Sequence, residues 1–230
     1  MHNTAMQHGR LFFETYLRSP EGKTIVDLGA QDVNGSLRTV APPAANYIGV
    51  DFEAANGVDV VIDDPYSLPF EDASIDACVS SSCFEHSEFF WLSFMEALRI
   101  LKPDGLLYLN VPSNGYFHRY PVDCWRFYPD SGIALQNWAQ RGGLKTMMLE
   151  SFIGQQKSGI WNDFVAVFLK DGRNLDLHKD RILHRFRDFT NGRLDGSPEI
   201  LNHRVDAQDQ RNPWATARRI IRNKLLGGFK

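Results

Sequence analysis

Short apolar runs and helically spaced apolar residues alternate along the first half of the chain. Five runs are short enough and apolar enough for buried strands: 24–28, 47–51, 58–62, 74–81 and 106–111. Apolar residues recur at helical spacing in 7–18 and 89–101, and a further helix is expected to begin near Asn34. Strands that alternate with helices predict βαβ units and therefore a parallel sheet.

The second half of the chain has a different pattern. A turn is expected at 103–105, before the fifth strand, and a helix at 133–141. Residues 144–152 and 161–169 have strand patterns, and the connection between them is too short for a helical crossover, so they should be antiparallel neighbours. The pattern weakens from 171 onward. The sequence therefore predicts one domain over 1–170 and a basic, partly helical extension over 171–230.

The ends of the first two strands carry the clearest chemical signal. The first strand ends in Asp27-Leu28-Gly29, and the second ends in Asp51. In a doubly wound sheet, the backbone approaches a ligand closely at the carboxyl end of the first strand. An acid at the tip of the second strand accepts hydrogen bonds from ribose hydroxyls. This pairing predicts a site for an adenosine-containing cofactor.

The loop after the first strand distinguishes between cofactors. It lacks the G-x-G-x-x-G spacing that holds a pyrophosphate at a helix N-terminus. Asp32 lies between its two glycines, Gly29 and Gly35. An acid here would repel a pyrophosphate but suits a ligand with ammonium and sulfonium charges, which is S-adenosylmethionine. The alternative is an ordinary turn in which both glycines only permit a positive φ.

Composition narrows the class of protein. The 230 residues are 43% hydrophobic and 12% aromatic, which allows a sizeable core. No apolar run approaches the roughly 18 residues of a membrane span, and the N-terminus lacks the layout of a signal peptide. Cys78, Cys83 and Cys124 form no C-x-x-C pair, so neither a disulfide framework nor a metal site is expected, and a cytoplasmic location is predicted.

Charge is distributed unevenly. Residues 1–170 contain 12 basic and 20 acidic residues, whereas 171–230 contain 13 and 8. A mildly acidic main part lacks the positive face that nucleic acid needs, so no nucleic-acid partner is expected.

The basic tail has an amphipathic pattern over 213–226, with three arginines beside the apolar face formed by Trp214, Ala217, Ile221 and Leu225. A helix on a membrane surface is one interpretation. Packing against the body or a partner is favoured, because Lys224 interrupts the apolar stripe. The sequence is compatible with a homodimer.

Six segments follow one another along the chain: Val26-Asp27-Leu28-Gly29, Gly49-Val50-Asp51, Asp64-Pro65-Tyr66-Ser67-Leu68-Pro69-Phe70, Ser74-Ile75-Asp76-Ala77-Cys78-Val79-Ser80, Phe84-Glu85-His86 and Leu98-Arg99-Ile100-Leu101-Lys102-Pro103-Asp104-Gly105. In this order and at this spacing, the chain resembles the class I S-adenosylmethionine-dependent methyltransferases, particularly the type 11 methyltransferase domain, over roughly 22–170. The resemblance implies an α/β fold, with a Rossmann-like, doubly wound, mostly parallel seven-stranded sheet that ends in an antiparallel hairpin, plus a C-terminal helical extension.

The resemblance also implies which residues hold the cofactor, S-adenosylmethionine. Asp51 corresponds to the acid that binds the ribose, and Asp64 to an acid near the adenine amino group. The chain departs from the family's D-x-G-x-G-x-G pattern, since Gln31 replaces the middle glycine. Gly35 is expected to supply the missing close approach. The predicted cofactor-binding residues are Asp27, Gly29, Gln31, Gly35, Asp51, Phe52, Asp64 and Ser81.

Two loops reach the rim toward which the transferable methyl group would point: 80–86, after the fourth strand, and 113–128, after the fifth. The second loop is dense in aromatic and titratable side chains, which suit stacking and hydrogen bonding to a ligand. His118 is the first candidate for a general base, with Asp123 to orient it and His86 as the next candidate. The predicted substrate-binding residues are Tyr116, Arg119, Tyr120, Trp125 and Arg126.

Each of these assignments has a structural alternative. His118 could be a loop histidine bonded to a neighbour. The role of Asp123 could be limited to an ion pair with Arg119 or Arg126 of the same loop. Glu85 could cap the helix that follows it. Cys83 is not expected to act as a nucleophile, because direct methyl transfer needs none.

The sequence therefore predicts a methyltransferase that O-methylates a small polar acceptor, such as a sugar or a glycan intermediate. Arginines in the 113–128 loop suit a carboxylate or a phosphate on the acceptor, and the aromatic side chains suit sugar rings. One alternative is an NAD-binding oxidoreductase, against which the missing third glycine and the terminal hairpin argue. Another is a non-catalytic module that binds S-adenosylmethionine.

Overall fold

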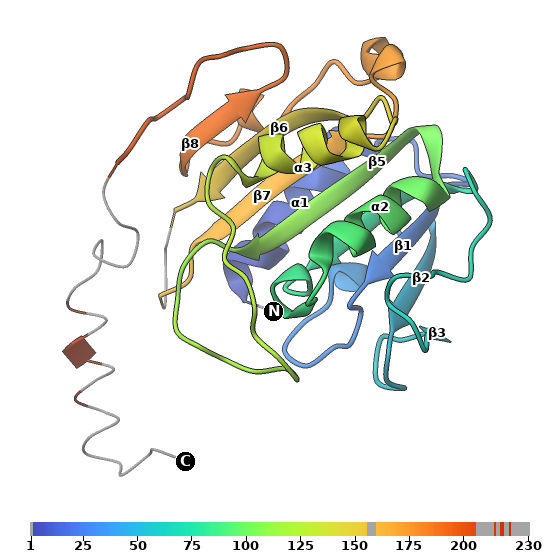
Figure 1. Cartoon of the computed structure of the whole chain (residues 1–230), viewed down its shortest axis with the longest axis horizontal. Helices are drawn as coiled ribbons and strands as arrows, with labels where there is room; N and C mark the ends of the chain where they lie inside the picture. Colours follow the sequence, from blue (N-terminus) through green and yellow to red (C-terminus); the bar gives the residue numbers. More distant parts are fainter. Residues whose placement is uncertain (1, 156–159, 206–213, 215–216, 219–220, 222–230) are drawn as a thin grey trace.

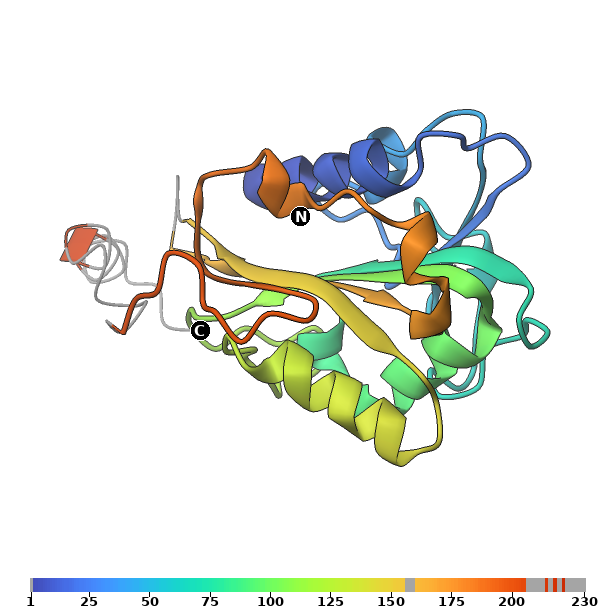
Figure 2. The same cartoon turned by 90° about the horizontal axis from the view of Figure 1, so that it is seen from above.

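The computed structural model describes residues 2–155 and 160–205 and, of the tail, 214, 217, 218 and 221. These residues form one eight-stranded sheet in the order β3-β2-β1-β4-β5-β7-β6-β8, with helices on both faces (Figures 1 and 2). The strands are β1 (Thr24–Leu28), β2 (Asn46–Asp51), β3 (Val60–Val61), β4 (Ile75–Ser81), β5 (Leu101–Pro112), β6 (Met147–Gly154), β7 (Asp163–Leu169) and β8 (Phe189–Leu194).

The sheet combines a parallel part and an antiparallel part. Strands β1 to β5 pair in parallel. Strand β7 is antiparallel to β6, as predicted, and it is also antiparallel to β5. The strand order reverses direction between β1 and β4, which makes the sheet doubly wound. In such sheets a ligand binds in the crevice outside the carboxyl ends of the strands at the reversal.

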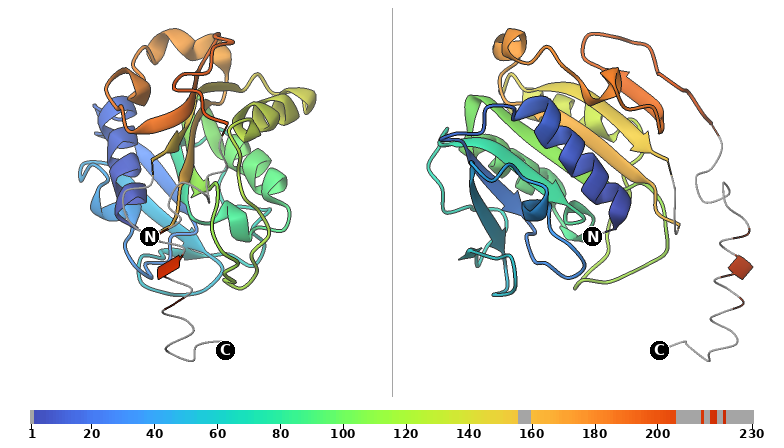
Figure 3. Two further views of the ribbon diagram at one scale, coloured as in Figure 1. Left: turned by 90° about the vertical axis from the view of Figure 1, so that its left-hand side faces the viewer. Right: turned by 180° about the vertical axis from the view of Figure 1, so that it is seen from behind.

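Helices cover both faces of the sheet (Figure 3). Helix α1 (Asn3–Tyr16) lies on one face, and α2 (Phe90–Ile100) and α3 (Ser131–Arg141) lie on the other. The ring of Phe12 packs 4.8 Å from Tyr108 on the α1 face, and that of Phe94 packs 5.0 Å from Phe168 on the opposite face. Because both faces are covered, every residue of β4 and β7 is buried, which explains why both strands are mainly apolar.

The prediction of a helix that begins near Asn34 is wrong. The connection from β1 to β2 contains only the 3₁₀ turn η1 (Leu37–Thr39). Asp32 accepts a hydrogen bond from the backbone of Gly35 at 2.7 Å, which closes a tight turn before η1. The face is already covered by α1, since a Cβ on Gly9 would lie 2.3 Å from Leu37. Helix α1 therefore occupies the space that a second helix on this face would need.

Two strand boundaries also differ from those expected. β3 has two residues instead of five. The expected turn at 103–105 lies inside β5, where the pairing with β4 shifts register after Ile75. A Cβ on Gly105 would lie 2.9 Å from the carbonyl oxygen of Lys102, so glycine permits this irregular backbone.

The sheet has eight strands rather than the predicted seven, because β8 pairs with β6 beyond the hairpin. Asn191 has a φ of 51° and is followed by Gly192, and residues of these types are uncommon in strands, so the pattern hid β8. The segment before β8 contains the 3₁₀ turns η3 (Gly172–Leu177) and η4 (Ile182–His184) rather than α-helices.

The division into 1–170 and 171–230 stays a prediction. The amphipathic pattern of 213–226 lies almost wholly outside the described residues. Within the described ranges, no helix combines the length and the apolar character that crossing a bilayer requires.

Candidate functional site

A cavity of about 330 Å³ opens at the carboxyl ends of β1 and β4, where the strand order reverses. The loop after β1 and the end of β2 line one side, and residues 81–84, 86 and 87 line another. Residues 118–120, from the loop after β5, complete the wall. We call the loop 113–128 the acceptor loop. The two loops that were expected to reach the rim therefore border the same cavity as the cofactor motifs.

Asp51 is held in a fixed orientation at the end of β2. Its Oδ2 accepts a hydrogen bond from the backbone of Gln31 at 3.0 Å, and its Oδ1 accepts one from the backbone of Phe52 at 2.8 Å. A carboxylate has about four lone-pair positions, so two stay available to a ligand. Phe52 is 47% exposed and lines the cavity beside this carboxylate. The pair can offer a ribose two acceptors and an adenine an apolar ring.

Gly29 is required by packing as well as by its backbone conformation. Its φ is +80°, and a Cβ there would lie 2.5 Å from the Cβ of Cys83. The close contact brings the loops after β1 and β4 together. Burial raises the pKa of the Cys83 thiol to about 12, so the thiol stays protonated and does not act as a nucleophile.

Two of the predicted cofactor residues do not line the cavity. Asp27 is buried, and its Oδ2 accepts a hydrogen bond from the hydroxyl of Tyr47 at 2.6 Å. Burial raises the pKa of Asp27 to about 7, against the opposing effect of that hydrogen bond. Asp64 is exposed and accepts a hydrogen bond from the backbone of Tyr66, whereas its neighbour Pro65 lines the cavity. The other six predicted residues are among the lining residues: Gly29, Gln31, Gly35, Asp51, Phe52 and Ser81.

The lining fits S-adenosylmethionine on one specific observation. Ser81 is buried, and its Oγ has no hydrogen-bond partner among the described residues. A buried polar atom without a partner is uncommon, and in a cavity wall it is satisfied when a polar ligand binds. Asp51 would hold the ribose, while Ile62 and Leu68 add apolar surface for the adenine. When bound, the cofactor supplies a methyl group that is activated by the positive charge on its sulfur.

The acceptor loop is anchored to the end of the sheet at several points. The side-chain nitrogen Nδ2 of Asn114 donates to the carbonyl oxygen of Ile160 at 2.9 Å, and the backbone nitrogen of Phe127 donates to the carbonyl oxygen of Pro112 at 3.0 Å. The backbone nitrogens of 124 and 125 donate to the carbonyl oxygen of Glu85. This last contact ties the acceptor loop directly to the loop after β4.

His118 lies against a buried carboxylate within the acceptor loop. Its backbone nitrogen donates to Oδ2 of Asp123 at 2.6 Å, and its ring Nδ1 lies 3.3 Å from the same oxygen. Arg126 donates to both carboxylate oxygens, at 2.6 and 2.9 Å. Burial disfavours the charged carboxylate, but the hydrogen bonds from Arg126 and His118 hold the pKa of Asp123 at about 2. Asp123 therefore pairs with Arg126 and lies within ion-pair distance of the His118 ring. The Nδ1 of His118 is hydrogen-bonded to the carbonyl oxygen of Tyr116 at 3.3 Å, which leaves Nε2 for a ligand.

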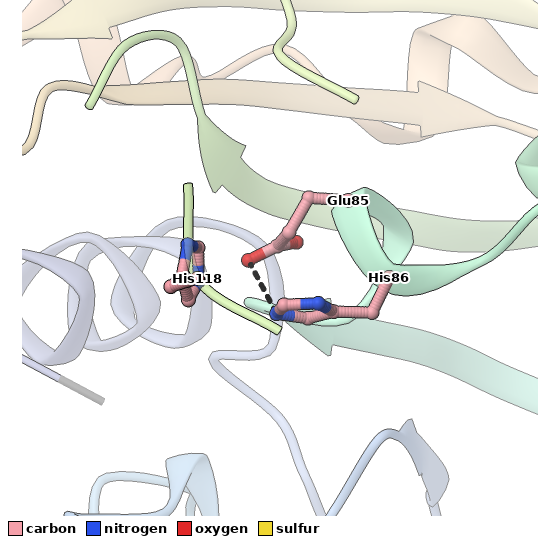
Figure 4. A group of neighbouring side chains, drawn as sticks. All are labelled: Glu85, His86 and His118. Carbon is pink, nitrogen blue, oxygen red and sulfur yellow. Dashed lines mark ion pairs between the residues drawn. The ribbon is translucent and has the colours of Figure 1, made fainter. Parts of the chain in front are cut away.

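His86 lies beside His118, with the two ring centroids 4.9 Å apart (Figure 4). Its Nδ1 is hydrogen-bonded to the carbonyl oxygen of Val122, and burial lowers its pKa. The carboxylate of Glu85 lies with Oε1 3.7 Å from Nε2 of His86. Glu85 does not cap the following helix, because α2 has no side-chain cap. Burial instead raises the pKa of Glu85 to about 8.

The predicted substrate-binding residues divide into two groups. Arg119 and Tyr120 line the cavity. The hydroxyl of Tyr120 donates to Oε1 of Gln31, which links the acceptor loop to the loop after β1. Tyr116, Trp125 and Arg126 are not lining residues; they support the loop through contacts with Trp161, the backbone of Ser87 and Asp123.

Two residues that shape the site were not predicted for it. Trp161 packs against His118, with ring centroids 4.9 Å apart, and a Cβ on Gly115 would lie 2.1 Å from its ring. The only sequence signal is the glycine in the acceptor loop, which shows that something approaches closely but not what. Glu85 is the second, since the sequence does not show that its carboxylate is buried next to two histidines.

Comparison with known proteins agrees with this geometry. Residues 28–109 match the family model described as a methyltransferase domain. An uncharacterized methyltransferase of Mycobacterium tuberculosis is 33% identical over 121 residues, which cover 47% of this chain and 46% of that protein. The chain therefore spans about half the length of this curated relative.

Solved structures share the fold at low sequence identity. A Burkholderia thailandensis 1,6-didemethyltoxoflavin-N1-methyltransferase, with bound 1,6-didemethyltoxoflavin and S-adenosylhomocysteine, is 14% identical, with a TM-score of 0.57 over 73% of this chain and 78% of that one. The [4+2]-cyclase SpnF is 15% identical, with a TM-score of 0.55 over 72% and 81%. One fold thus supports different reactions. Residues 28–109 thus match a methyltransferase domain, and the doubly wound sheet has the fold of the solved structures named above.

Proposed function

We propose that the protein transfers the methyl group of S-adenosylmethionine to an oxygen of a small polar acceptor, such as a sugar or a glycan intermediate. One observation carries the proposal: a single cavity is lined by Asp51 and Ser81 on the cofactor side and by His118 and Arg119 on the acceptor side. Methyl transfer requires donor and acceptor to meet in line, shielded from water, and a shared cavity provides that alignment.

The chemistry needs one proton acceptor. The acceptor's oxygen forms a bond to the methyl carbon, the electrons of the broken carbon–sulfur bond stay on sulfur, and the hydroxyl proton goes to Nε2 of His118. Asp123 lies within ion-pair distance of the ring and stabilises the imidazolium that forms. The products are the methyl ether, S-adenosylhomocysteine and a protonated histidine, which releases its proton to solvent.

The acceptor side suits a polar molecule that carries negative charge. Among the described residues, Nε of Arg119 donates to the carbonyl oxygen of Pro121 at 3.1 Å. The rest of the guanidinium can bind a carboxylate or a phosphate. The small-molecule acceptor of the Burkholderia thailandensis enzyme supports a search among small molecules. It does not indicate which atom is methylated here.

Isothermal titration calorimetry with S-adenosylhomocysteine tests the cofactor part of the proposal. We expect micromolar affinity for the wild type and a large loss for Asp51→Ala. Asp63→Ala is the matched control, because Asp63 is exposed near the same rim and does not line the cavity. No binding by the wild type would contradict the proposal, and a nicotinamide fluorescence change with NADH in its place would favour an oxidoreductase.

A release assay tests the transfer itself. The protein is incubated with S-adenosylmethionine and a panel of hydroxylated acceptors, with and without a carboxylate or phosphate, and acceptor-dependent S-adenosylhomocysteine is measured. Tight cofactor binding without release for any acceptor class would favour a non-catalytic module.

A further inference from the structure

We propose that Glu85, His86 and His118 form a binding site for a divalent transition-metal ion at the acceptor side of the cavity. One ligand atom from each residue lies within 4.8 Å of the other two (Figure 4). Two imidazole nitrogens and one carboxylate oxygen are ligands that suit zinc and similar first-row ions. The cysteine pattern gives no hint of this site, because it uses no cysteine.

The carboxylate of Glu85 is the first reason to place an ion here. Its side chain is 1% exposed, and its Oε2 has no hydrogen-bond partner among the described residues. Burying a carboxyl oxygen without a hydrogen-bond partner is costly. His86 does not satisfy it, since the 3.7 Å between Oε1 and Nε2 exceeds hydrogen-bond distance. An ion bound by the carboxylate of Glu85 and by Nε2 of His86 would give both side chains a partner, which a hydrogen bond across 3.7 Å does not.

Both histidines are oriented as metal-binding histidines are. The Nδ1 of His86 is bonded to the carbonyl oxygen of Val122, and the Nδ1 of His118 is bonded to the carbonyl oxygen of Tyr116 at 3.3 Å, with the carboxylate of Asp123 beside it. A backbone carbonyl or a carboxylate behind the ring fixes the tautomer and directs the other nitrogen toward an ion. Both rings therefore present Nε2, and both residues line the cavity through which an ion would enter.

Charge and distance also permit an ion. The neighbouring cation, Arg126, is bonded to both oxygens of Asp123 and acts on Glu85 only through space. Ligand atoms about 2.1 Å from a tetrahedral ion are about 3.4 Å apart. Glu85 and His86 are already close to that separation. The His118 ring is 33% exposed and its ligand atom lies within 4.8 Å of the other two, so a small rotation of the ring would complete the set.

The site bears on the acceptor if the proposed methyl transfer is correct. Three protein ligands leave room on the ion for an oxygen of the acceptor. An ion lowers the pKa of a hydroxyl that binds it, so a hydroxylated acceptor would be favoured. Nε2 of His118 can hold either the ion or a proton, not both. The metal-loaded and metal-free proteins therefore activate the hydroxyl in different ways.

Binding is tested without any methyl acceptor. Chelator-treated full-length protein is titrated with Zn²⁺ by calorimetry and with Co²⁺ by visible absorption. We expect one ion per chain, with a dissociation constant of about 10 μM or tighter, and at least about tenfold weaker binding for Glu85→Gln and for His86→Gln. His203→Ala is the control, because His203 is an exposed histidine outside the cavity.

Each outcome decides the matter. Absence of stoichiometric binding by the wild type, or equal binding by the wild type and both site variants, overturns the proposed site. Circular dichroism and S-adenosylhomocysteine binding are measured on the same samples. A variant that keeps its fold and cofactor affinity but loses the ion supports the site. If the wild type does not bind S-adenosylhomocysteine, the proposed methyl transfer is contradicted, and the result on metal binding is unaffected.

Discussion

The cofactor side and the acceptor side of the cavity are built by different means. The cofactor side uses backbone positions at the ends of β1, β2 and β4, where Gly29 and Asp51 sit within strongly patterned segments. The acceptor side uses a long loop whose geometry depends on contacts between distant residues, such as the backbone bonds from 124 and 125 to Glu85. The positions of the cofactor-binding residues are therefore set by the ends of the strands. An acceptor site follows from side-chain partnerships that can vary without changing the fold.

If the acceptor side carries the chemistry, His118→Ala has the largest effect. We expect turnover to fall by about 10² to 10⁴, the usual contribution of a general acid or base. Affinity for S-adenosylhomocysteine should change little, because the backbone of the acceptor loop keeps its anchors. Turnover comes from a release assay with the identified acceptor, and unchanged turnover would make His118 a loop residue only.

The cofactor side is tested by Asp51→Ala, with the next largest effect. Loss of two charge-assisted hydrogen bonds to a ribose should weaken S-adenosylhomocysteine by about 2–4 kcal/mol, or about 30- to 1000-fold. Calorimetry gives the affinity, and Asp63→Ala should match the wild type. An equal loss in both variants would show that general charge, and not a contact of Asp51, is responsible.

Asp27 sharpens the comparison, because it belongs to the cofactor motif but lies behind the cavity. Its pKa is raised by burial from 3.8 to about 7. Between these values the folded protein keeps a proton that the unfolded chain has lost, so the free energy of unfolding falls as pH rises from about 4 to 7. Asp27→Asn removes this dependence and keeps a partner for Tyr47.

Urea denaturation of both proteins at several pH values measures the effect. The stability of Asp27→Asn relative to the wild type should rise by a few kcal/mol between pH 4 and 7 and level off above pH 8. Asp63→Asn should run parallel to the wild type throughout. Parallel curves for Asp27→Asn would show that Asp27 titrates normally in the folded protein.

The link between the two sides should have the smallest effect. Tyr120→Phe removes the hydroxyl that donates to Gln31 across the cavity. A hydrogen bond of this kind contributes about 0.5–1.5 kcal/mol, so cofactor affinity should fall by about twofold to tenfold. Tyr128→Phe is the control, since Tyr128 is 66% exposed and outside the cavity. An effect as large as that of Asp51→Ala would mean that the two sides are not separate.

Much of the fold follows from local pattern. The mainly apolar runs at 24–28 and 74–81 became β1 and β4, because strands covered on both faces are mostly apolar. The helix near Asn34 failed for a non-local reason, since α1 already covers that face. β8 was missed because Asn191 and Gly192 weaken a strand pattern that long-range pairing with β6 overrides.

Residues of the site could be predicted from the sequence where they lie in strongly patterned segments. Six of the eight expected cofactor residues line the cavity, because motif glycines and strand-end acids are fixed by the sheet. The acceptor side gave His118, Arg119 and Tyr120, but no pattern distinguishes these from supporting residues such as Trp125. The position of Glu85 depends on how two loops pack, which a single sequence does not encode locally.

The most direct test of the central claim is a crystal structure of the protein with S-adenosylhomocysteine. We predict the ribose hydroxyls within hydrogen-bond distance of Asp51, the adenine beside Phe52 and Leu68, and the sulfur facing the wall formed by His86 and His118. A ligand bound elsewhere, or one whose sulfur faces away from the acceptor loop, would contradict the account.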